Sequence, residues 1–260
     1  IDASTLVDLA KLSLGEQQEN NFMITAEMTK FIRQIEPSGI TISVGGEIGE
    51  VGKRNSTVAD LRAFMSGYMA CLGPDRTSIS KISIQTGTKH GGVVMPDGSL
   101  VKVKVDFETL KKISEVARRE YGLAGAVQHG ASTLPDTAFD NFPKVNTAEV
   151  HLATGFQNII YDSPYFPPDL LEKINTHLRD KYRDERNTED TEDQFLYKAR
   201  KKAFGDFKGE LWDLPTENMK RIRDTLKERF ALLFQKLGVT DTVTLVNEYV
   251  AETPSIERLD

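Results

Sequence analysis

Short strand-like runs alternate with helical patterns over about the first 160 residues of the chain. The strand-like runs are GITISVGGEIG (39–49), SISKISIQTG (78–87), LAGAVQHG (123–130) and AEVHLATG (148–155). Helical patterns fall between them at 15–36, 57–72 and 106–121. Strands that are separated by helices are typical of βα units, so the sequence predicts an α/β fold with a parallel sheet.

The predicted helices carry apolar residues at helical spacing. In the 15–36 segment these are Met28, Phe31, Ile32 and Ile35. The 57–72 segment opens with a capping-box pattern, Thr57 with Asp60. One face of that segment presents Leu61, Phe64, Met65, Tyr68, Met69 and Leu72. We therefore expect amphipathic helices that cover the sheet.

The pattern changes after about residue 160. Residues 167–236 are charged and helical, with no strand-like run, and DERNTEDTED (184–193) is a predicted solvated loop. The chain has 260 residues, of which 39% are hydrophobic, and this is enough for a sizeable core. We expect later βα units of a barrel over 1–165 and a mainly helical C-terminal extension over 166–260.

Composition excludes several classes of function. The net charge is −6, the isoelectric point is near 5.4, and no basic stripe is interleaved with aromatic residues, so a nucleic-acid partner is not expected. No apolar run approaches the roughly 20 residues of a membrane span. The single cysteine, Cys71, excludes an internal disulfide framework and indicates a reducing, cytoplasmic setting.

Three of the histidines lie at or just past the end of a predicted strand, and Glu47 does the same. These histidines are His90, His129 and His151. In a parallel barrel the carboxyl ends of all strands meet on one face, where catalytic groups lie. Because imidazole is the commonest zinc ligand, the sequence predicts a metal site there. A structural, hydrogen-bonded histidine is the alternative at each position, and Glu50 competes with Glu47.

Small residues and hydroxyls follow these histidines. They are Gly91 after His90, Gly130, Ala131 and Ser132 after His129, and Ala153 and Thr154 after His151. Free N–H groups and hydroxyls in such loops are suited to phosphate. A metal beside a phosphate site favours a phosphorylated sugar as the substrate. Ser132 as a turn or N-cap residue is the alternative interpretation.

Five ordered motifs carry a resemblance to a known family. They are IDAST, GGEIGEVG, QTGTKHGG, AVQHGAST and VHLAT. With these motifs, over about residues 1–162, the chain resembles the class II, metal-dependent fructose-bisphosphate aldolases and their ketose-bisphosphate relatives. The resemblance implies a TIM (β/α)8 barrel that uses Zn²⁺, or another divalent metal. The implied reaction is the reversible cleavage of a ketose bisphosphate to dihydroxyacetone phosphate and an aldehyde.

The resemblance also implies roles for individual residues. His90 and His129 match zinc ligands, and Glu47 and Asp2 match acidic residues near the metal. The residues that match the family's phosphate loops are Gly91, Gly130, Ala131, Ser132 and Thr154. Gly130-Ala131-Ser132 stands where the family has G-G-S, and this change keeps a backbone donor. Glu47 and His151 are the expected catalytic residues. His151 stands where the family has asparagine, so the identity of the substrate is left open.

The family's first zinc histidine and its catalytic aspartate lie on an earlier strand, and nothing precedes Ile1 here. The chain is therefore expected to hold only the later half of the barrel and to be part of a longer homo-oligomeric protein, a dimer or a tetramer.

Two alternatives to the aldolase function remain. One is another metal-dependent phosphosugar enzyme, such as an epimerase or a tagatose-bisphosphate aldolase. The other is a non-catalytic barrel subunit that binds phosphate without metal.

Overall fold

A single parallel sheet lies at the centre of the computed structural model, which describes residues 1–49, 54–88, 94–96 and 104–250. Its strands, in spatial order, are β1 (Gly45–Glu47), β2 (Lys81–Ile84), β3 (Ala126–Gln128) and β4 (Glu149–Val150). Neighbouring strands are parallel throughout. The predicted α/β fold with a parallel sheet is therefore confirmed. Within the described ranges the sheet stays open, with β1 and β4 at its edges.

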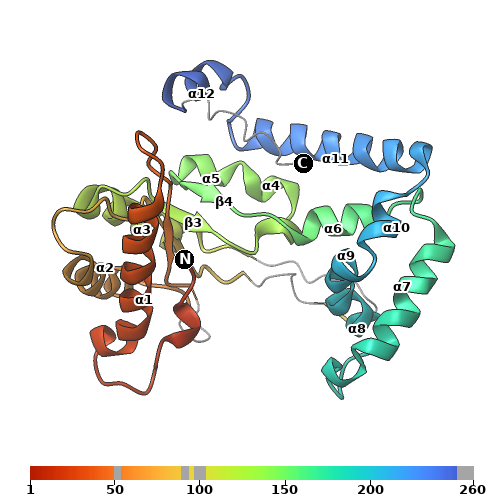
Figure 1. Cartoon of the computed structure of the whole chain (residues 1–260), viewed down its shortest axis with the longest axis horizontal. Coiled ribbons are helices and arrows are strands. Elements are labelled where there is room, and N and C mark those ends of the chain that lie inside the picture. Colours follow the sequence, from red (N-terminus) through yellow and green to blue (C-terminus); the bar gives the residue numbers. More distant parts are fainter. Residues whose placement is uncertain (50–53, 89–93, 97–103, 251–260) are drawn as a thin grey trace.

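Three long helices accompany the first strands (Figure 1). They are α1 (Leu14–Ile35), α2 (Val58–Leu72) and α3 (Phe107–Tyr121). Thr57 and Asp60 form the predicted capping box at the start of α2, and Ser13 and Glu16 form another at the start of α1. Gly122 ends α3 in the left-handed region, at φ 66°, which glycine adopts without strain.

The inward face of α1 is polar, contrary to expectation. Its buried residues are Gln18, Asn21, Thr25, Ala26 and Thr29, whereas Met28, Phe31 and Ile35 are exposed. Most of these polar groups form hydrogen bonds, although the side-chain oxygen of Asn21 has no partner. The side-chain amide of Asn21 donates to the carbonyl of Glu47 at 2.9 Å, and the Thr25 and Thr29 hydroxyls donate to carbonyls one turn earlier. Short side chains on this face accompany the extensive packing of α1 on α2.

The face predicted for α2 is buried with one exception. Leu61, Phe64, Met65, Tyr68 and Leu72 are buried, and the prediction for Met69 was wrong, because it is 42% exposed. Gly67 on the same helix faces α1, where a Cβ atom would come within 2.4 Å of the Phe22 ring.

The strands are shorter than the predicted runs, and their two faces differ. In the 39–49 run only Gly45–Glu47 is strand. Ile82 and Ile84 on β2 are buried in the apolar core, while the alternate residues Lys81 and Ser83 belong to the opposite face. This opposite face carries polar side chains, and together with residues at the carboxyl ends of the strands they form the candidate site.

The rest of the described chain is mainly helical. The remaining α-helices are α4 (Asp136–Phe139), α5 (Asn141–Lys144), α6 (Thr154–Tyr161), α7 (Pro168–Lys181), α8 (Glu192–Ala199), α9 (Ala203–Asp206), α10 (Lys208–Trp212), α11 (Thr216–Lys236) and α12 (Val243–Tyr249). The predicted loop at 184–193 includes the start of α8.

Two buried apolar clusters underlie this arrangement. The larger joins the sheet to α1–α3, and the smaller joins α6 to α7–α11. Helix α11 contributes Leu233 to the first and Ile222 to the second. The division at residue 165 stays a prediction. In the described part of the chain no helix has the length and apolarity needed to span a membrane.

Candidate functional site

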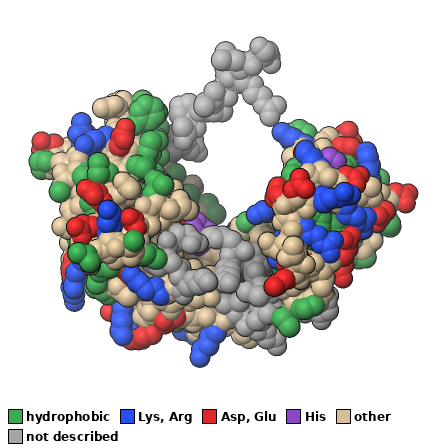
Figure 2. Space-filling model, turned by 90° about the horizontal axis from the view of Figure 1, so that it is seen from below, with side chains coloured by type: hydrophobic (Ala, Val, Ile, Leu, Met, Phe, Trp, Pro, Cys, Tyr) green, Lys and Arg blue, Asp and Glu red, His purple; other side chains and the backbone are tan. Residues whose placement is uncertain are grey.

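Glu47, His129 and His151 meet at the carboxyl ends of the strands. Glu47 is the last residue of β1, and the two histidines directly follow β3 and β4. Glu47 Oε2 lies 3.3 Å from His129 Nδ1, and the His129 and His151 rings stack with centroids 4.6 Å apart. Figure 2 shows histidine atoms deep in the hollow between the two lobes of the molecule. The predicted convergence of these residues on one face therefore holds in the structure.

Glu47 is the most buried acidic group of this cluster, at 6% exposure. Burial raises the pKa of its carboxyl group, and the nearby Asp2 carboxylate acts in the same direction. Glu47 Oε1 accepts a hydrogen bond from the Gly49 backbone at 2.6 Å. A buried carboxylate of this kind is stabilised by a cation beside it.

A second pair of charged residues continues the cluster beyond His151. His151 Nε2 lies 2.8 Å from Glu149 Oε2, and Glu149 also forms an ion pair with Lys81. A carboxylate can only accept hydrogen bonds, so Glu149 holds the proton of His151 on Nε2. Burial alone would raise the pKa of Glu149, but the hydrogen bonds from Lys81 and His151 lower it.

Lys81 and Glu149 were missed by the sequence analysis. The signal that could have found them is the alternation within each strand. Lys81 and Ser83 alternate with two isoleucines in KISI, and Glu149 precedes Val150. In a sheet that helices cover on one face, polar residues at alternate positions point to the other face, where a site can form.

A buried hydrogen-bond network fixes the backbone of His129. Gln128 is fully buried, and its amide accepts from Thr86 Oγ1 at 2.7 Å and donates to Thr88 Oγ1 at 3.0 Å. The amide of Gln128 and the hydroxyl of Thr88 both donate to the His129 carbonyl, at 2.6 and 2.8 Å. These bonds fix the backbone at the strand end from which the imidazole projects.

The loop after His129 packs against the start of α6. Gly130 adopts φ 66° and is followed by a short 3-10 turn, Ala131–Thr133. Ser132 Oγ accepts a hydrogen bond from the backbone N–H of Ala153 at 2.7 Å. The approach is close, because a Cβ at Gly155 would lie 2.5 Å from the Ser132 carbonyl oxygen. The predicted phosphate residues Gly130–Ser132 and Ala153–Thr154 thus lie next to each other.

The other predicted residues lie at the start of the chain or outside the described part. His90, Gly91 and the competing Glu50 fall outside the described residues. Asp2 Oδ1 accepts hydrogen bonds from the backbone and hydroxyl of Ser4, so its carboxylate caps the turn that follows. Among the described residues, no group of three His, Cys, Asp or Glu side chains is arranged to hold a metal.

The fold and this cluster define an α/β protein whose titratable groups gather at the carboxyl ends of parallel strands. A family model described as fructose-bisphosphate aldolase class-II matches residues 2–236. The chain therefore belongs to the class II fructose-bisphosphate aldolase family. A comparison with the curated proteins finds no match.

Solved structures give a weaker similarity. One is a protein from Coccidioides immitis assigned as a fructose-1,6-biphosphate aldolase, with 17% identity and a TM-score of 0.43 over 79% of this chain and 60% of that one. Another is the YdjI aldolase from Escherichia coli K12, with 15% identity and a TM-score of 0.36 over 78% of this chain and 54% of that one. The chain thus spans less than two thirds of either protein, and family membership rests on the family model.

Proposed function

We propose that the protein containing this chain is an aldolase-type lyase that cleaves a ketose bisphosphate reversibly, with a divalent metal such as Zn²⁺. The observation that carries the proposal is the pairing of buried Glu47 with His129 at the strand ends, beside a loop suited to phosphate. Membership of the class II aldolase family agrees with it. Fructose 1,6-bisphosphate is the substrate to test first.

The donor chemistry of the site fits a divalent metal in part. His129 and Glu47 would supply an imidazole nitrogen and a carboxylate oxygen, which are both zinc ligands. Asp2 is close enough to influence the Glu47 carboxyl group. A third ligand would come from His90, outside the described residues. When bound, the metal would polarise the substrate carbonyl and stabilise the negative charge that develops on it.

Ser132 and the start of α6 are the proposed phosphate site. Ser132 Oγ accepts from the Ala153 backbone, which leaves the hydroxyl hydrogen to donate to a phosphate oxygen. Thr154 is the first residue of α6, so its N–H group is at the positive end of the helix dipole. A phosphate held there would fix the position of the reacting carbons relative to His129 and His151.

His151 is the proposed contact to a substrate oxygen. Its Nε2 is engaged by Glu149, and its ring is half-exposed beside His129. The remaining nitrogen, Nδ1, can therefore accept or donate a hydrogen bond, according to the protonation of the ring. Lys81 acts through Glu149 as a positioning residue, because it holds the carboxylate that orients His151.

The proposal is tested in the full-length protein with His129→Ala and a matched control, His177→Ala. His177 lies on α7 and pairs with Asp206, away from the site. The expected result is loss of bound zinc and of fructose-bisphosphate cleavage in His129→Ala alone. Unchanged zinc content and unchanged cleavage in that variant would refute the assignment.

The same measurements separate the rival functions. An epimerase or an aldolase for tagatose bisphosphate would keep the metal and prefer another substrate in a panel of phosphorylated sugars. A non-catalytic subunit would bind phosphate and contain no metal by elemental analysis. Assembly into a dimer or tetramer stays a prediction, which sedimentation of the full-length protein tests. The cytoplasmic location also stays a prediction.

A further inference from the structure

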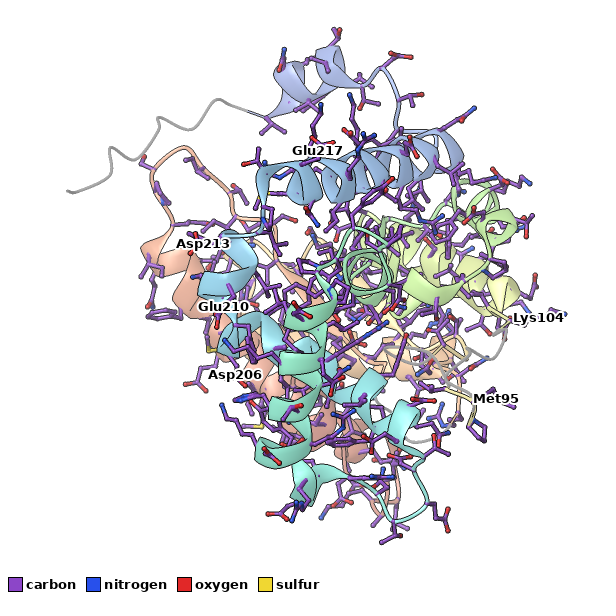
Figure 3. All side chains as sticks on the ribbon, turned by 90° about the vertical axis from the view of Figure 1, so that its right-hand side faces the viewer. Met95, Lys104, Asp206, Glu210, Asp213 and Glu217 are labelled. Carbon is purple, nitrogen blue, oxygen red and sulfur yellow. The ribbon has the colours of Figure 1, made fainter. Side chains whose placement is uncertain are left out.

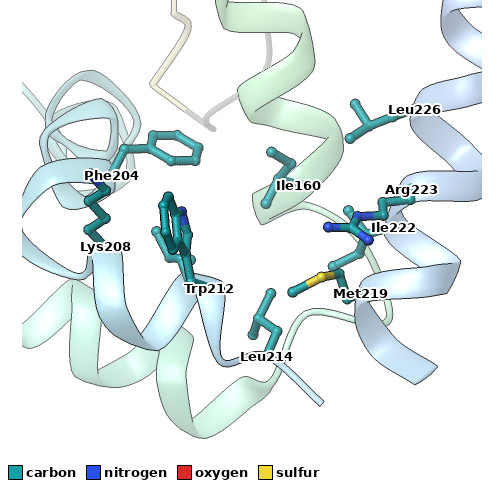
Figure 4. Close-up of a pocket in the computed structure, with 10 residues that line it drawn as sticks. Ile160, Phe204, Lys208, Trp212, Leu214, Met219, Ile222, Arg223 and Leu226 are labelled. Carbon is teal, nitrogen blue, oxygen red and sulfur yellow. The ribbon is translucent and has the colours of Figure 1, made fainter. Parts of the chain in front are cut away.

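An apolar groove lies in the helical part of the chain, among α6, α9, α10 and α11. Its volume is about 450 Å³, and it shares no lining residue with the candidate active site. Figure 4 shows Ile160, Phe204, Trp212 and Met219 around it. This volume is in the range of pockets that hold small organic ligands, from about 300 to 1,000 Å³.

Trp212 is unusually exposed for a residue that lines an apolar groove. Its exposed fraction is 72%, although it comes from α10, which packs against α9. The Lys208 ammonium lies 5.0 Å from the centre of the indole ring. Large exposed aromatic groups in a concave apolar setting mark binding surfaces more often than isolated exposed residues do.

Two cations line the groove, Lys208 and Arg223. In Figure 4 the Arg223 guanidinium extends from α11 toward the space beside Met219 and Trp212. Neither cation forms an ion pair with any described carboxylate. Neighbouring cations do form them, since Lys173 pairs with Glu210 and Arg221 pairs with Glu217. Arg223 is therefore available to an anion that enters the groove.

Acidic residues on the same side of the molecule do not cancel the positive charge of Lys208 and Arg223 in the groove. Figure 3 shows Asp206 on α9, Glu210 on α10, Asp213 directly after α10 and Glu217 near the start of α11. Asp206 pairs with Lys181 and Glu210 with Lys173. Neither these residues nor Asp213 and Glu217 line the groove, so its own charge is positive.

We propose that this groove binds an amphipathic organic anion, an apolar chain or ring that carries one carboxylate. The apolar part would pack against Phe204, Trp212 and Met219, and its carboxylate would accept hydrogen bonds from Arg223. Guanidinium groups match the planar geometry of carboxylates and bind them strongly. The site is separate from the proposed aldolase chemistry and does not depend on it.

Trp212 makes the proposal directly measurable, because it is the only tryptophan in the chain. Octanoate is the probe, and 1-octanol is its uncharged counterpart with the same chain length. Each is titrated into the full chain of 260 residues while the fluorescence of Trp212 is followed. Arg223→Gln removes the proposed anchor, and Arg221→Gln removes a neighbouring exposed arginine that does not line the groove.

Octanoate is expected to change the fluorescence saturably and to bind more tightly than 1-octanol. Arg223→Gln should weaken octanoate binding about tenfold, because it removes a hydrogen bond between charged groups, and should change octanol binding less than twofold. Arg221→Gln should behave as the unmodified protein. Equal affinities for the two probes, an unaffected Arg223→Gln variant, or no fluorescence response would each overturn the proposal. The comparison of the two probes requires no variant, so a folding defect cannot obscure it.

Discussion

The imidazole rings of His129 and His151 stack at 4.6 Å between centroids, although the residues follow different strands. Each ring is anchored by a different carboxylate, Glu47 for His129 and Glu149 for His151. The stack therefore joins two acid–imidazole pairs into one cluster. One pair is largely buried and suited to a metal, and the other is half-exposed and suited to contact a substrate.

The hydroxyl of Ser132 is expected to contribute to phosphate binding more than to turnover. Ser132→Ala removes this hydroxyl and also the acceptor for the Ala153 N–H group. Loss of one such hydrogen bond costs about 1 kcal/mol, or roughly five- to tenfold. We expect the KM for fructose 1,6-bisphosphate to rise by roughly five- to tenfold in steady-state kinetics, with a smaller change in kcat. Thr133→Ala in the same turn is the control, and an equal effect of both variants would contradict the assignment.

Lys81 is expected to act through Glu149. Lys81→Met removes the ion pair, so the Glu149 carboxylate loses one of its two partners and holds His151 less firmly. We expect kcat to fall by about tenfold, in the range seen when a supporting hydrogen bond of a site is removed. Lys81→Arg keeps the charge and should restore part of the activity. An unchanged kcat in the Lys81→Met variant would show that Lys81 has no role in the site.

The capping box of α2 is expected to make stability depend on pH. Burial alone would raise the pKa of Asp60, but hydrogen bonds from Arg54 and Thr57 outweigh it and lower the pKa. A lowered pKa means that the carboxylate stabilises the fold above the unfolded value of about 4, and that this contribution is lost as the pH falls below it. Asp60→Asn should lower the free energy of unfolding at pH 7 by about 1–2 kcal/mol.

Urea unfolding at pH 7 and at about pH 3 checks this prediction. The difference between Asp60→Asn and the unmodified protein should shrink at the lower pH, because the unfolded carboxyl group then binds a proton and the native carboxylate loses its advantage. Asp75→Asn, at an exposed position after α2, is the control. A difference that stays constant over this range would show that the ionised carboxylate contributes nothing.

Two helix glycines are expected to respond in opposite directions to alanine. A Cβ at Gly67 would meet the Phe22 ring at 2.4 Å, whereas a Cβ at Gly209 on α10 has nothing within 4 Å. Alanine stabilises an open helix position by about 0.5–1 kcal/mol, and overpacking costs about 1–3 kcal/mol. Gly209→Ala should therefore raise the thermal midpoint and Gly67→Ala should lower it. A stabilised Gly67→Ala variant would mean that α1 and α2 separate easily.

The sequence alone determined the features that depend on neighbouring residues. The capping box of Thr57 and Asp60, the alternation of strands with helices, and the position of His129 and His151 at strand ends all follow from local patterns. Local patterns suffice here because caps and strand ends involve residues within a few positions of each other. The family resemblance drawn from these motifs is confirmed by the family model.

Only the tertiary structure decided which groups face each other. Local periodicity predicted an apolar inner face for α1, but its polar face packs inward because Asn21 bonds the Glu47 carbonyl and the threonines satisfy their own hydroxyls. The pairing of Lys81 with Glu149, and the stack of His129 on His151, join residues from different strands. Such contacts depend on strand order and register, and these are set by the packing of the whole sheet.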